Sequence, residues 1–332
     1  MNKKTIVHTG VAPGTALPDE RAVLDGLSDV ELVLRGKCKT PQEVLAAVHD
    51  ADAALCNGEP FTRDVFLGAP RLKVVVRYGI GVDTIDLDAA TECGVMAANF
   101  PDFCIEEVAN HALVLLLSCA KRIARLDRCL RQQGWEKARS LMHDMGQVHH
   151  ETLGLVGFGN IARALAKRGQ VMGMQVIAYD PYVKPEVFQA MGVRAVDVDT
   201  LAREADYVSL HVPATAETRG LVNAHFLEEM KPNAYLINTS RGAIVNEPDL
   251  IAALQQNRIA GAALDVFAAE PLTPDSPLLS MDQVVLTPHT ASYADATFVS
   301  LRTRVAKSAL AVVRGGRPEF VANPRVLDRL RQ

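Results

Sequence analysis

The segment Gly154-Leu155-Val156-Gly157-Phe158-Gly159-Asn160-Ile161-Ala162 decides the fold that this sequence predicts. A strand-like apolar run leads into its glycines and a helical pattern follows them, which is the context of a dinucleotide-binding turn. Gly157 permits the tight turn, Gly159 lets the backbone approach a pyrophosphate, and Ala162 is small enough for the helix to pack on the strand. The segment therefore predicts a dinucleotide cofactor.

The phosphates of that cofactor would lie at the amino end of the helix, beside Phe158 and at the amides near Asn160 and Ile161. The next strand-like run, 175–179, leads to Asp180, about 20 residues beyond the glycines. A carboxylate at this point would accept hydrogen bonds from the adenosine ribose and would repel a 2′-phosphate. The sequence thus predicts NAD rather than NADP.

Helical patterns separate six strand-like runs in this part of the chain, as a doubly wound Rossmann-type parallel sheet requires. The domain would span 104–293 and open with a long helix at 104–122, whose apolar sides suggest a second subunit as one of its covers. The six runs lie at 152–157, 175–179, 206–210, 234–238, 260–265 and 283–286.

The first hundred residues show a similar alternation and predict a separate parallel α/β domain. A helical stripe at 295–313 follows a sheet that is already complete, so we expect it to return to this first domain. The domain would then consist of 1–103 and 294–332, with the second domain inserted. Its strand-like runs lie at 5–8, 31–34, 53–56, 73–77 and 95–97.

Composition and charge favour a small-molecule partner. The formal charge of -4 comes from scattered residues, which argues against nucleic acid or an anionic membrane surface as a partner. The start of the chain does not resemble a signal peptide, and the apolar segment 112–120 is far below the roughly 20 residues that span a bilayer. We expect a cytoplasmic protein. Six cysteines without a C-x-x-C pair are expected to be free thiols.

Three chemically active side chains follow three neighbouring strands of the inserted sheet. Arg241 follows the run 234–238, Glu270 follows 260–265, and His289 follows 283–286. Ligands of open α/β sheets bind at the carboxyl ends of the strands. Taken singly, each residue is better explained as a salt bridge, a turn residue or a loop histidine, but together beside a cofactor they form a set for carbonyl reduction.

The roles within this set follow from the side-chain chemistry. Arg241 offers a permanently charged fork for a carboxylate and a polarised carbonyl. His289 can give a proton to the carbonyl oxygen as hydride arrives and can remove it in the reverse direction. Glu270 would hold the imidazole and favour its protonated form. These three residues are the predicted catalytic residues.

Several ordered motifs also resemble the D-isomer-specific 2-hydroxyacid dehydrogenases, over nearly the whole chain. Residues 77–86 are similar to the substrate loop of that family, and residues 103–109 are similar to its hinge helix. The phosphoglycerate dehydrogenases and the C-terminal-binding-protein group look like the nearest branches. The other matching segments are Gly154 to Ala162, His211-Val212-Pro213 with Glu217-Thr218, Asn238 to Gly242, Asp265 to Pro271, and Pro288-His289.

The resemblance implies a homodimer with a flavodoxin-like substrate domain, an NAD domain, and Arg241, Glu270 and His289 as the catalytic trio. Asp265 would lie near the nicotinamide carboxamide, and backbone amides of the substrate loop would bind the substrate carboxylate. Beyond the turn, the implied cofactor-binding residues are Val108, His211, Val212, Pro213, Thr218, Thr239, Ser240 and Asp265. The implied substrate-binding residues are Arg77, Tyr78, Gly79, Ile80 and Gly81.

The leading hypothesis is therefore an enzyme that moves hydride between NAD(H) and the C2 atom of a small 2-hydroxy or 2-keto acid of the D series. The alternative is an NAD-sensing scaffold of the corepressor kind, with weak or no turnover. Arg77 could favour a phosphorylated acid or could be a structural ion pair. His143, His149 and His150 could suggest a metal, but a solvated loop is the better reading and we predict no metal site.

Overall fold

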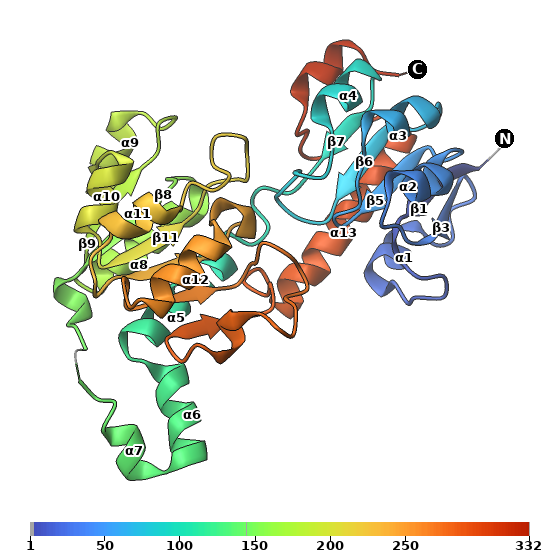
Figure 1. Cartoon of the computed structure of the whole chain (residues 1–332). Coiled ribbons are helices and arrows are strands. Elements are labelled where there is room, and N and C mark those ends of the chain that lie inside the picture. The colour runs from blue at the N-terminus through green and yellow to red at the C-terminus, as the bar shows by residue number, and fades with distance from the viewer. Residues whose placement is uncertain (1–2, 144, 332) are drawn as a thin grey trace. The chain divides into compact units, whose positions relative to one another are not determined.

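The computed structural model describes residues 3–143 and 145–331. The chain divides into two compact units, and each is described by itself (Figure 1). Unit 1 comprises Met1–Cys104 and Ala294–Gln332, and unit 2 comprises Ile105–Tyr293. Within the described residues, every helix is too short or too polar to cross a membrane.

Unit 2 contains a seven-stranded, entirely parallel sheet with the strand order β10-β9-β8-β11-β12-β13-β14. The order reverses between β8 and β11, as in a doubly wound Rossmann sheet, so the predicted fold class is confirmed for this unit. Its strands are β8 (Thr152–Val156), β9 (Gln175–Tyr179), β10 (Arg194–Ala195), β11 (Tyr207–Leu210), β12 (Tyr235–Asn238), β13 (Gly261–Leu264) and β14 (Val284–Leu286).

Helices cover both faces of this sheet. Leu116 and Leu165 pack with the strand residue Leu155 in one apolar core, and Leu227 and Leu250 belong to the core of the opposite face. Fully buried strands of this kind are typical of parallel sheets. The first face is covered by α5 (Ile105–Ala120), α8 (Asn160–Val171) and α9 (Pro185–Ala190), and the second by α10 (Val198–Glu204), α11 (Ala224–Glu229) and α12 (Glu247–Gln255).

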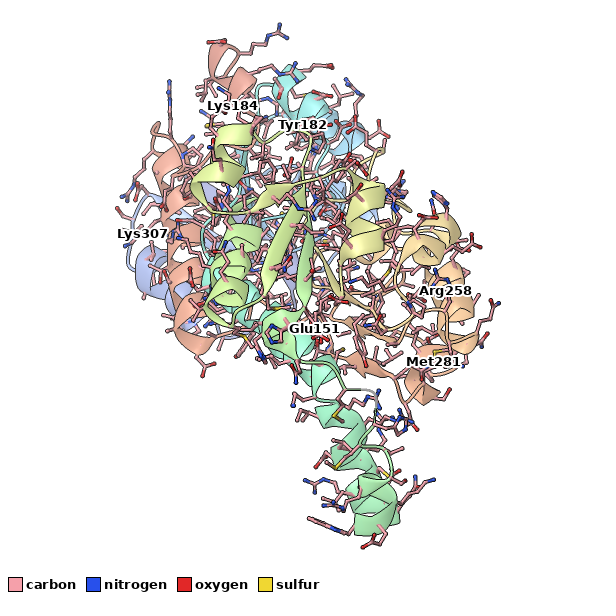
Figure 2. All side chains as sticks on the ribbon, turned by 90° about the vertical axis from the view of Figure 1, so that its left-hand side faces the viewer. Glu151, Tyr182, Lys184, Arg258, Met281 and Lys307 are labelled. Carbon is pink, nitrogen blue, oxygen red and sulfur yellow. The ribbon has the colours of Figure 1, made fainter. Side chains whose placement is uncertain are left out.

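A helical arm that the sequence did not predict extends from unit 2 between α5 and β8. Arg122 has a φ of +51°, so the chain changes direction after α5 at this residue. Two helices follow, α6 (Ile123–Gln133) and α7 (Trp135–Arg139). Figures 1 and 2 show these two helices projecting away from the sheet of their unit. The exposed large apolar side chains of α5 and the arm are Val114, Ile123, Leu130, Trp135 and Met142.

Unit 1 contains a five-stranded parallel sheet in the order β3-β1-β5-β6-β7, which is the order of flavodoxin-like folds. The strands are β1 (Lys4–His8), β3 (Val30–Leu34), β5 (Ala53–Cys56), β6 (Val74–Arg77) and β7 (Met96–Ala98); β2 (Gly10–Val11) and β4 (Gly36–Lys37) form a separate antiparallel pair. This confirms the flavodoxin-like fold class.

The carboxyl end of the chain returns to unit 1. Its helix, α13 (Asp295–Val313), packs on α1 (Pro18–Leu24) and on the strands β5 and β6. Leu301, Val305 and Ala309 lie in the same buried core as Leu55 and Val76. The shorter helices of this unit are α2 (Pro41–Val48), α3 (Arg63–Gly68) and α4 (Leu87–Glu92).

A buried histidine ends the first strand of unit 1. His8 is 2% exposed, its ring stacks on Tyr78, and its Nδ1 accepts a hydrogen bond from the amide of Gly10 at 3.1 Å. Burial lowers the pKa of His8 from 6.5 to about 4. The folded protein therefore holds this imidazole neutral at pH values where an unfolded chain would protonate it.

This histidine makes stability depend on pH. The unfolded chain binds a proton at His8 below pH 6.5 and the folded chain does so only below about 4, so stability falls as the pH is lowered through that window. Between pH 7.5 and pH 5 we expect His8 to contribute a loss of about 2 kcal/mol. His8→Asn retains an acceptor but does not titrate, so urea unfolding at the two pH values should show a smaller loss. An equal loss in wild type and variant would contradict this assignment.

Candidate active site

The glycine turn joins β8 to α8 as the sequence predicts. Gly157 has a φ of +90°, and a Cβ there would lie 2.8 Å from the carbonyl oxygen of His211, so a larger residue would be strained and crowded. A Cβ added at Gly159 would meet no protein atom within 4 Å. Ala162 is fully buried against the sheet. The turn thus has open space on the side where a pyrophosphate would approach.

The amino end of α8 differs from those of α10, α11 and α12. α10, α11 and α12 begin with Asp197, Asn223 and Asn246, whose side chains each accept a backbone N–H of the first turn. α8 begins at Gly159 and has no side-chain cap. Its first amides, near Asn160 and Ile161, therefore remain available to an anion, and the helix dipole favours one there.

Asp180 lies beside this turn. Its Oδ2 accepts the amide of Phe158 at 2.8 Å and its Oδ1 accepts the amide of Tyr182 at 3.0 Å. The ring of Phe158 is fully buried and stacks on Phe188, so only its backbone faces the turn. The structure therefore brings the carboxylate and the glycines together.

The loops after β11 and β12 carry further residues that the resemblance implies for the cofactor. The hydroxyl of Thr239 is buried and has no hydrogen-bond partner, which fits a ligand group that would complete it. Ser240 donates to Asn238 at 2.9 Å. Thr218 donates to the carbonyl of Pro213 and so holds the 213–218 loop.

His211 and Val212 follow β11, and Val108 lies buried on α5. Nε2 of His211 lies 2.9 Å from the hydroxyl of Ser209, and burial lowers the pKa of this histidine to about 4. Its imidazole is therefore neutral at physiological pH. Together with the orphan hydroxyl of Thr239, these positions fit a dinucleotide.

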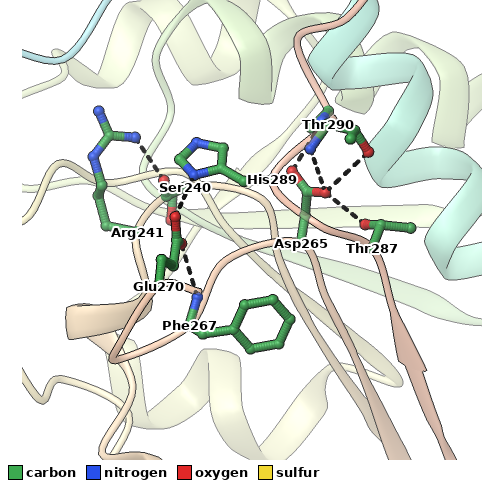
Figure 3. A network of polar contacts seen from close by, with 9 residues as sticks. Ser240, Arg241, Asp265, Phe267, Glu270, Thr287, His289 and Thr290 are labelled. Carbon is green, nitrogen blue, oxygen red and sulfur yellow. Dashed lines mark hydrogen bonds and ion pairs between the residues drawn. The ribbon is translucent and has the colours of Figure 1, made fainter. Parts of the chain in front are cut away.

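The three predicted catalytic side chains share the carboxyl edge of the sheet of unit 2 (Figure 3). Nδ1 of His289 lies 2.7 Å from Oε2 of Glu270, and Oε1 of Glu270 accepts the amide of Phe267 at 3.1 Å. Arg241 donates to the carbonyl of Ser240 at 2.7 Å. The histidine and the carboxylate thus form a hydrogen-bonded pair beside the arginine.

A glycine allows the arginine loop to lie next to the glutamate loop. A Cβ on Gly242 would lie 1.9 Å from the carbonyl oxygen of Phe267, so only glycine permits this approach. Phe267 is also the residue whose amide binds Glu270. Gly242 was part of a motif in the sequence, but its contact with the next loop could not be read from the pattern.

The charge state of Glu270 defines the proton positions in the pair. Burial raises the pKa of Glu270, but the hydrogen bonds from His289 and Phe267 and the nearby charges of His289 and Arg241 outweigh it, and the net pKa lies below its ordinary 4.5. An ionised carboxylate can only accept, so Nδ1 of His289 donates. Nε2 is then the nitrogen left for a substrate.

Asp265 holds the backbone around the catalytic histidine. It is completely buried, and its carboxylate accepts the amides of Thr290 and Ala291 at 2.9 Å each and the hydroxyl of Thr287 at 2.5 Å. His289 itself has a φ of +53°, in the left-handed region that a histidine seldom adopts. In this structure Asp265 contacts the 287–291 loop that carries this strained residue.

Unit 1 carries the predicted substrate loop after β6. The amides of Tyr78 and Gly79 donate to the carbonyls of Cys56 and Arg77. In the part of the chain that the structure describes, the amides of Ile80 and Gly81 donate to no acceptor. These two amides are therefore able to bind a carboxylate.

The side chains of Arg77 and Tyr78 in this loop form hydrogen bonds with residues of unit 1. Arg77 donates to the carbonyl of Tyr78 at 2.6 Å, and the hydroxyl of Tyr78 donates to Glu20 at 2.8 Å. The side-chain amide of Asn99 donates a hydrogen bond to the carbonyl of Ile80. Across residues 3–143 and 145–331, no three metal-binding side chains come together, and the ring centroids of His149 and His150 lie 3.9 Å apart.

Comparison with known proteins gives a family match. Residues 113–291 match the family described as D-isomer specific 2-hydroxyacid dehydrogenase, NAD binding domain. The chain is 38% identical over 286 residues to a glyoxylate reductase of Korarchaeum cryptofilum, a match that covers 86% of each protein. It is 37% identical over 307 residues to a D-3-phosphoglycerate dehydrogenase of Methanocaldococcus jannaschii, which covers 92% of this chain and 57% of that protein.

A solved structure supports the whole-chain fold. The D-lactate dehydrogenase of Aquifex aeolicus, solved with NAD and lactic acid, matches with a TM-score of 0.83 and 27% identity over 98% of both chains. The prediction of an NAD-binding oxidoreductase fold is thereby confirmed. The chain belongs to the D-isomer specific 2-hydroxyacid dehydrogenase family.

Proposed function

We propose that this protein transfers hydride between NAD(H) and the C2 atom of a small 2-hydroxy or 2-keto acid of the D series. The hydrogen-bonded pair of His289 and Glu270 beside Arg241 carries this proposal. Bound NADH supplies the hydride in the direction of reduction. The named relatives act, by their descriptions, on glyoxylate and D-3-phosphoglycerate, which supports a 2-keto acid as substrate class.

Arg241, His289 and Glu270 have different roles in the proposed carbonyl reduction. Arg241 binds the substrate carboxylate and polarises the C2 carbonyl. His289, held at Nδ1 by Glu270, gives its Nε2 proton to the carbonyl oxygen as C2 receives hydride, and takes that proton back in oxidation. One keto acid, one hydride and one proton give one hydroxy acid.

The test is oxidation of NADH, followed at its absorbance band, with glyoxylate, hydroxypyruvate, 2-ketobutyrate and phosphohydroxypyruvate. The proposal expects turnover of at least one of these acids. A protein inert towards the panel that captures a partner only in the presence of cofactor would instead be the NAD-sensing scaffold. A cytoplasmic location remains a prediction of the sequence.

We propose NAD rather than NADP because Asp180 stands beside the glycine turn. Asp180→Ser should raise the ratio of kcat/KM for NADPH to that for NADH about 10- to 100-fold, because removing one close charge removes repulsion of the 2′-phosphate. Asp180→Asn keeps an acceptor for the backbone amides and should shift the ratio in the same direction. Steady-state kinetics with both cofactors measures it, and a wild-type preference for NADPH would contradict the proposal.

We also propose a homodimer. Val114 on α5 and Ile123, Leu130 and Trp135 on the arm are 44 to 63% exposed. Large apolar side chains gathered on one projecting element are typical of a protein interface. Sedimentation equilibrium should give twice the chain mass, and Trp135→Glu with Leu130→Glu should give monomers.

A further inference from the structure

The buried carboxylate of Asp265 has a partner that the sequence did not indicate. Nε2 of His111, on α5, lies 3.0 Å from the hydroxyl of Thr287 and 3.6 Å from Oδ1 of Asp265. Among the residues that the structure describes, His111 is the only basic side chain within ion-pair distance of this carboxylate. A fully buried carboxylate is costly unless donors surround it. His111 therefore completes the environment of Asp265 from another element.

The direction of these hydrogen bonds can be assigned. The hydroxyl of Thr287 donates to Oδ1 of Asp265 at 2.5 Å, and two backbone amides donate to the same carboxylate. A hydroxyl has one proton, so its contact with His111 is one in which it accepts. Nε2 of His111 consequently carries a hydrogen, and a relay runs from His111 through Thr287 to Asp265.

The hydrogen bonds that run from His111 through Thr287 reach the backbone of His289 at Asp265. The carbonyl of Asp265 accepts the amide of His289 at 2.8 Å, and its carboxylate holds the next two amides. His289 keeps a φ of +53°, a conformation that persists only when its surroundings enforce it. A change at Asp265 or Thr287 would shift the backbone that places the imidazole against Glu270.

The element that supplies His111 is well suited to fix this loop. α5 is a helix of 16 residues that packs on β12, β13 and β14, the strands that precede the loops of Arg241, Glu270 and His289. In Figure 3 this helix runs beside Thr287 and Thr290. The side chain of His111 is 22% exposed, so most of its surface is in contact with the protein. A donor on a rigid helix thus anchors a strained loop.

We propose that His111 is a positioning residue for His289 and acts through Thr287 and Asp265. The effect on turnover rests on the proposed hydride transfer, whereas the effect on the geometry of His289 does not. His111 donates a hydrogen bond in this role, so an amide that reaches the same place should replace it. Its loss should lower kcat and leave the dinucleotide turn unchanged.

The kinetic test compares His111→Leu, which removes the donor, with His111→Gln, which retains one. We expect His111→Leu to lower kcat about 10- to 100-fold, since a small misplacement of a catalytic group costs that much. The dissociation constant for NADH, from fluorescence quenching, should change less than about 3-fold, and His111→Gln should stay within about 5-fold of wild-type kcat. His225→Leu, an exposed histidine on α11, is the matched control and should be neutral.

A double-mutant cycle tests the route. Thr287→Val removes the middle of the relay, so adding His111→Leu to it should lower kcat by less than about 3-fold more. Multiplicative effects of the two substitutions would overturn the relay. A His111→Leu variant with wild-type kcat, one that loses NADH affinity in parallel with kcat, or a His111→Gln variant as impaired as His111→Leu would overturn the positioning role.

A spectroscopic experiment separates this proposal from the proposed function. In protein labelled with ¹⁵N at histidine, the His289 ring signals, assigned by their absence in His289→Gln, should move in His111→Leu and remain in place in His111→Gln. If the wild type reduces no keto acid, the proposed function fails while this comparison still decides the role of His111. Unmoved His289 signals in His111→Leu would overturn it.

Discussion

His289→Ala should lower kcat for keto-acid reduction by about 100- to 10,000-fold, the range that general acid catalysis contributes. The expectation follows from the 2.7 Å contact of its Nδ1 with an ionised Glu270, which leaves Nε2 to serve the substrate. Steady-state kinetics at saturating NADH measures it. The dissociation constant for NADH should remain within about 3-fold of wild type, because the glycine turn and Asp180 are untouched.

Two further variants refine this result. Glu270→Gln should also lower kcat, though less, because an amide can still accept from Nδ1 but carries no charge to stabilise an imidazolium. His225→Ala, at an exposed position on α11, should have no effect. Wild-type turnover in His289→Ala would remove this histidine from the mechanism.

Arg241→Lys should lower kcat/KM by about 10- to 150-fold, equivalent to losing one charge-assisted hydrogen bond of roughly 1.5–3 kcal/mol. Lysine keeps the charge but lacks the planar fork that can bind a carboxylate and a carbonyl at once. Gly242 brings the loop of Arg241 against the backbone at Phe267, so the guanidinium is set beside Glu270. We therefore expect a larger KM for the keto acid together with a smaller kcat.

Arg241→Gln removes the charge as well and should be worse than Arg241→Lys. Arg203→Lys is the control, because Arg203 lies exposed on α10 and pairs with Glu229. NADH binding should be unchanged in all three variants. A change in kcat/KM for NADH without one for the keto acid would show that Arg241 serves the cofactor instead.

The fold could be predicted to a large extent from apolar runs and glycines. Among the described residues, the eleven strands of three or more residues were placed within one or two residues, and the return of α13 to unit 1 followed from its late position. β10 escaped prediction because it has only two residues, both exposed, and shows no apolar run.

The arm was not predicted, although Ile123, Leu126 and Leu130 of α6 recur at the spacing of one helix face. α6 and α7 bury Cys129 and Ala138 but leave Leu130 and Trp135 exposed. Its direction depends on Arg122 in the left-handed region, a conformation that no residue pattern announces outside glycine and asparagine. The periodicity of α6 is typical of a helix but does not indicate the direction in which that helix leaves its unit.

The candidate site was predictable in its members but not in its connections. Residues at the carboxyl ends of neighbouring strands had to lie at one edge, which brought Arg241, Glu270 and His289 together. The donor role of His111 could not be found, because a single histidine on an apolar helix is usually part of the core. Burial of Asp265 behind the 287–291 loop likewise depends on backbone geometry.

The central claim is that this site moves hydride to C2 of a keto acid and gives the D-hydroxy acid. The most direct measurement uses NADH deuterated at C4 with the best keto acid, followed by chiral chromatography and mass spectrometry of the product. We predict the D-enantiomer with deuterium at C2, and about 100- to 10,000-fold less of it in the same time from His289→Ala. An L-product, or a hydroxy acid without deuterium at C2, would contradict the claim.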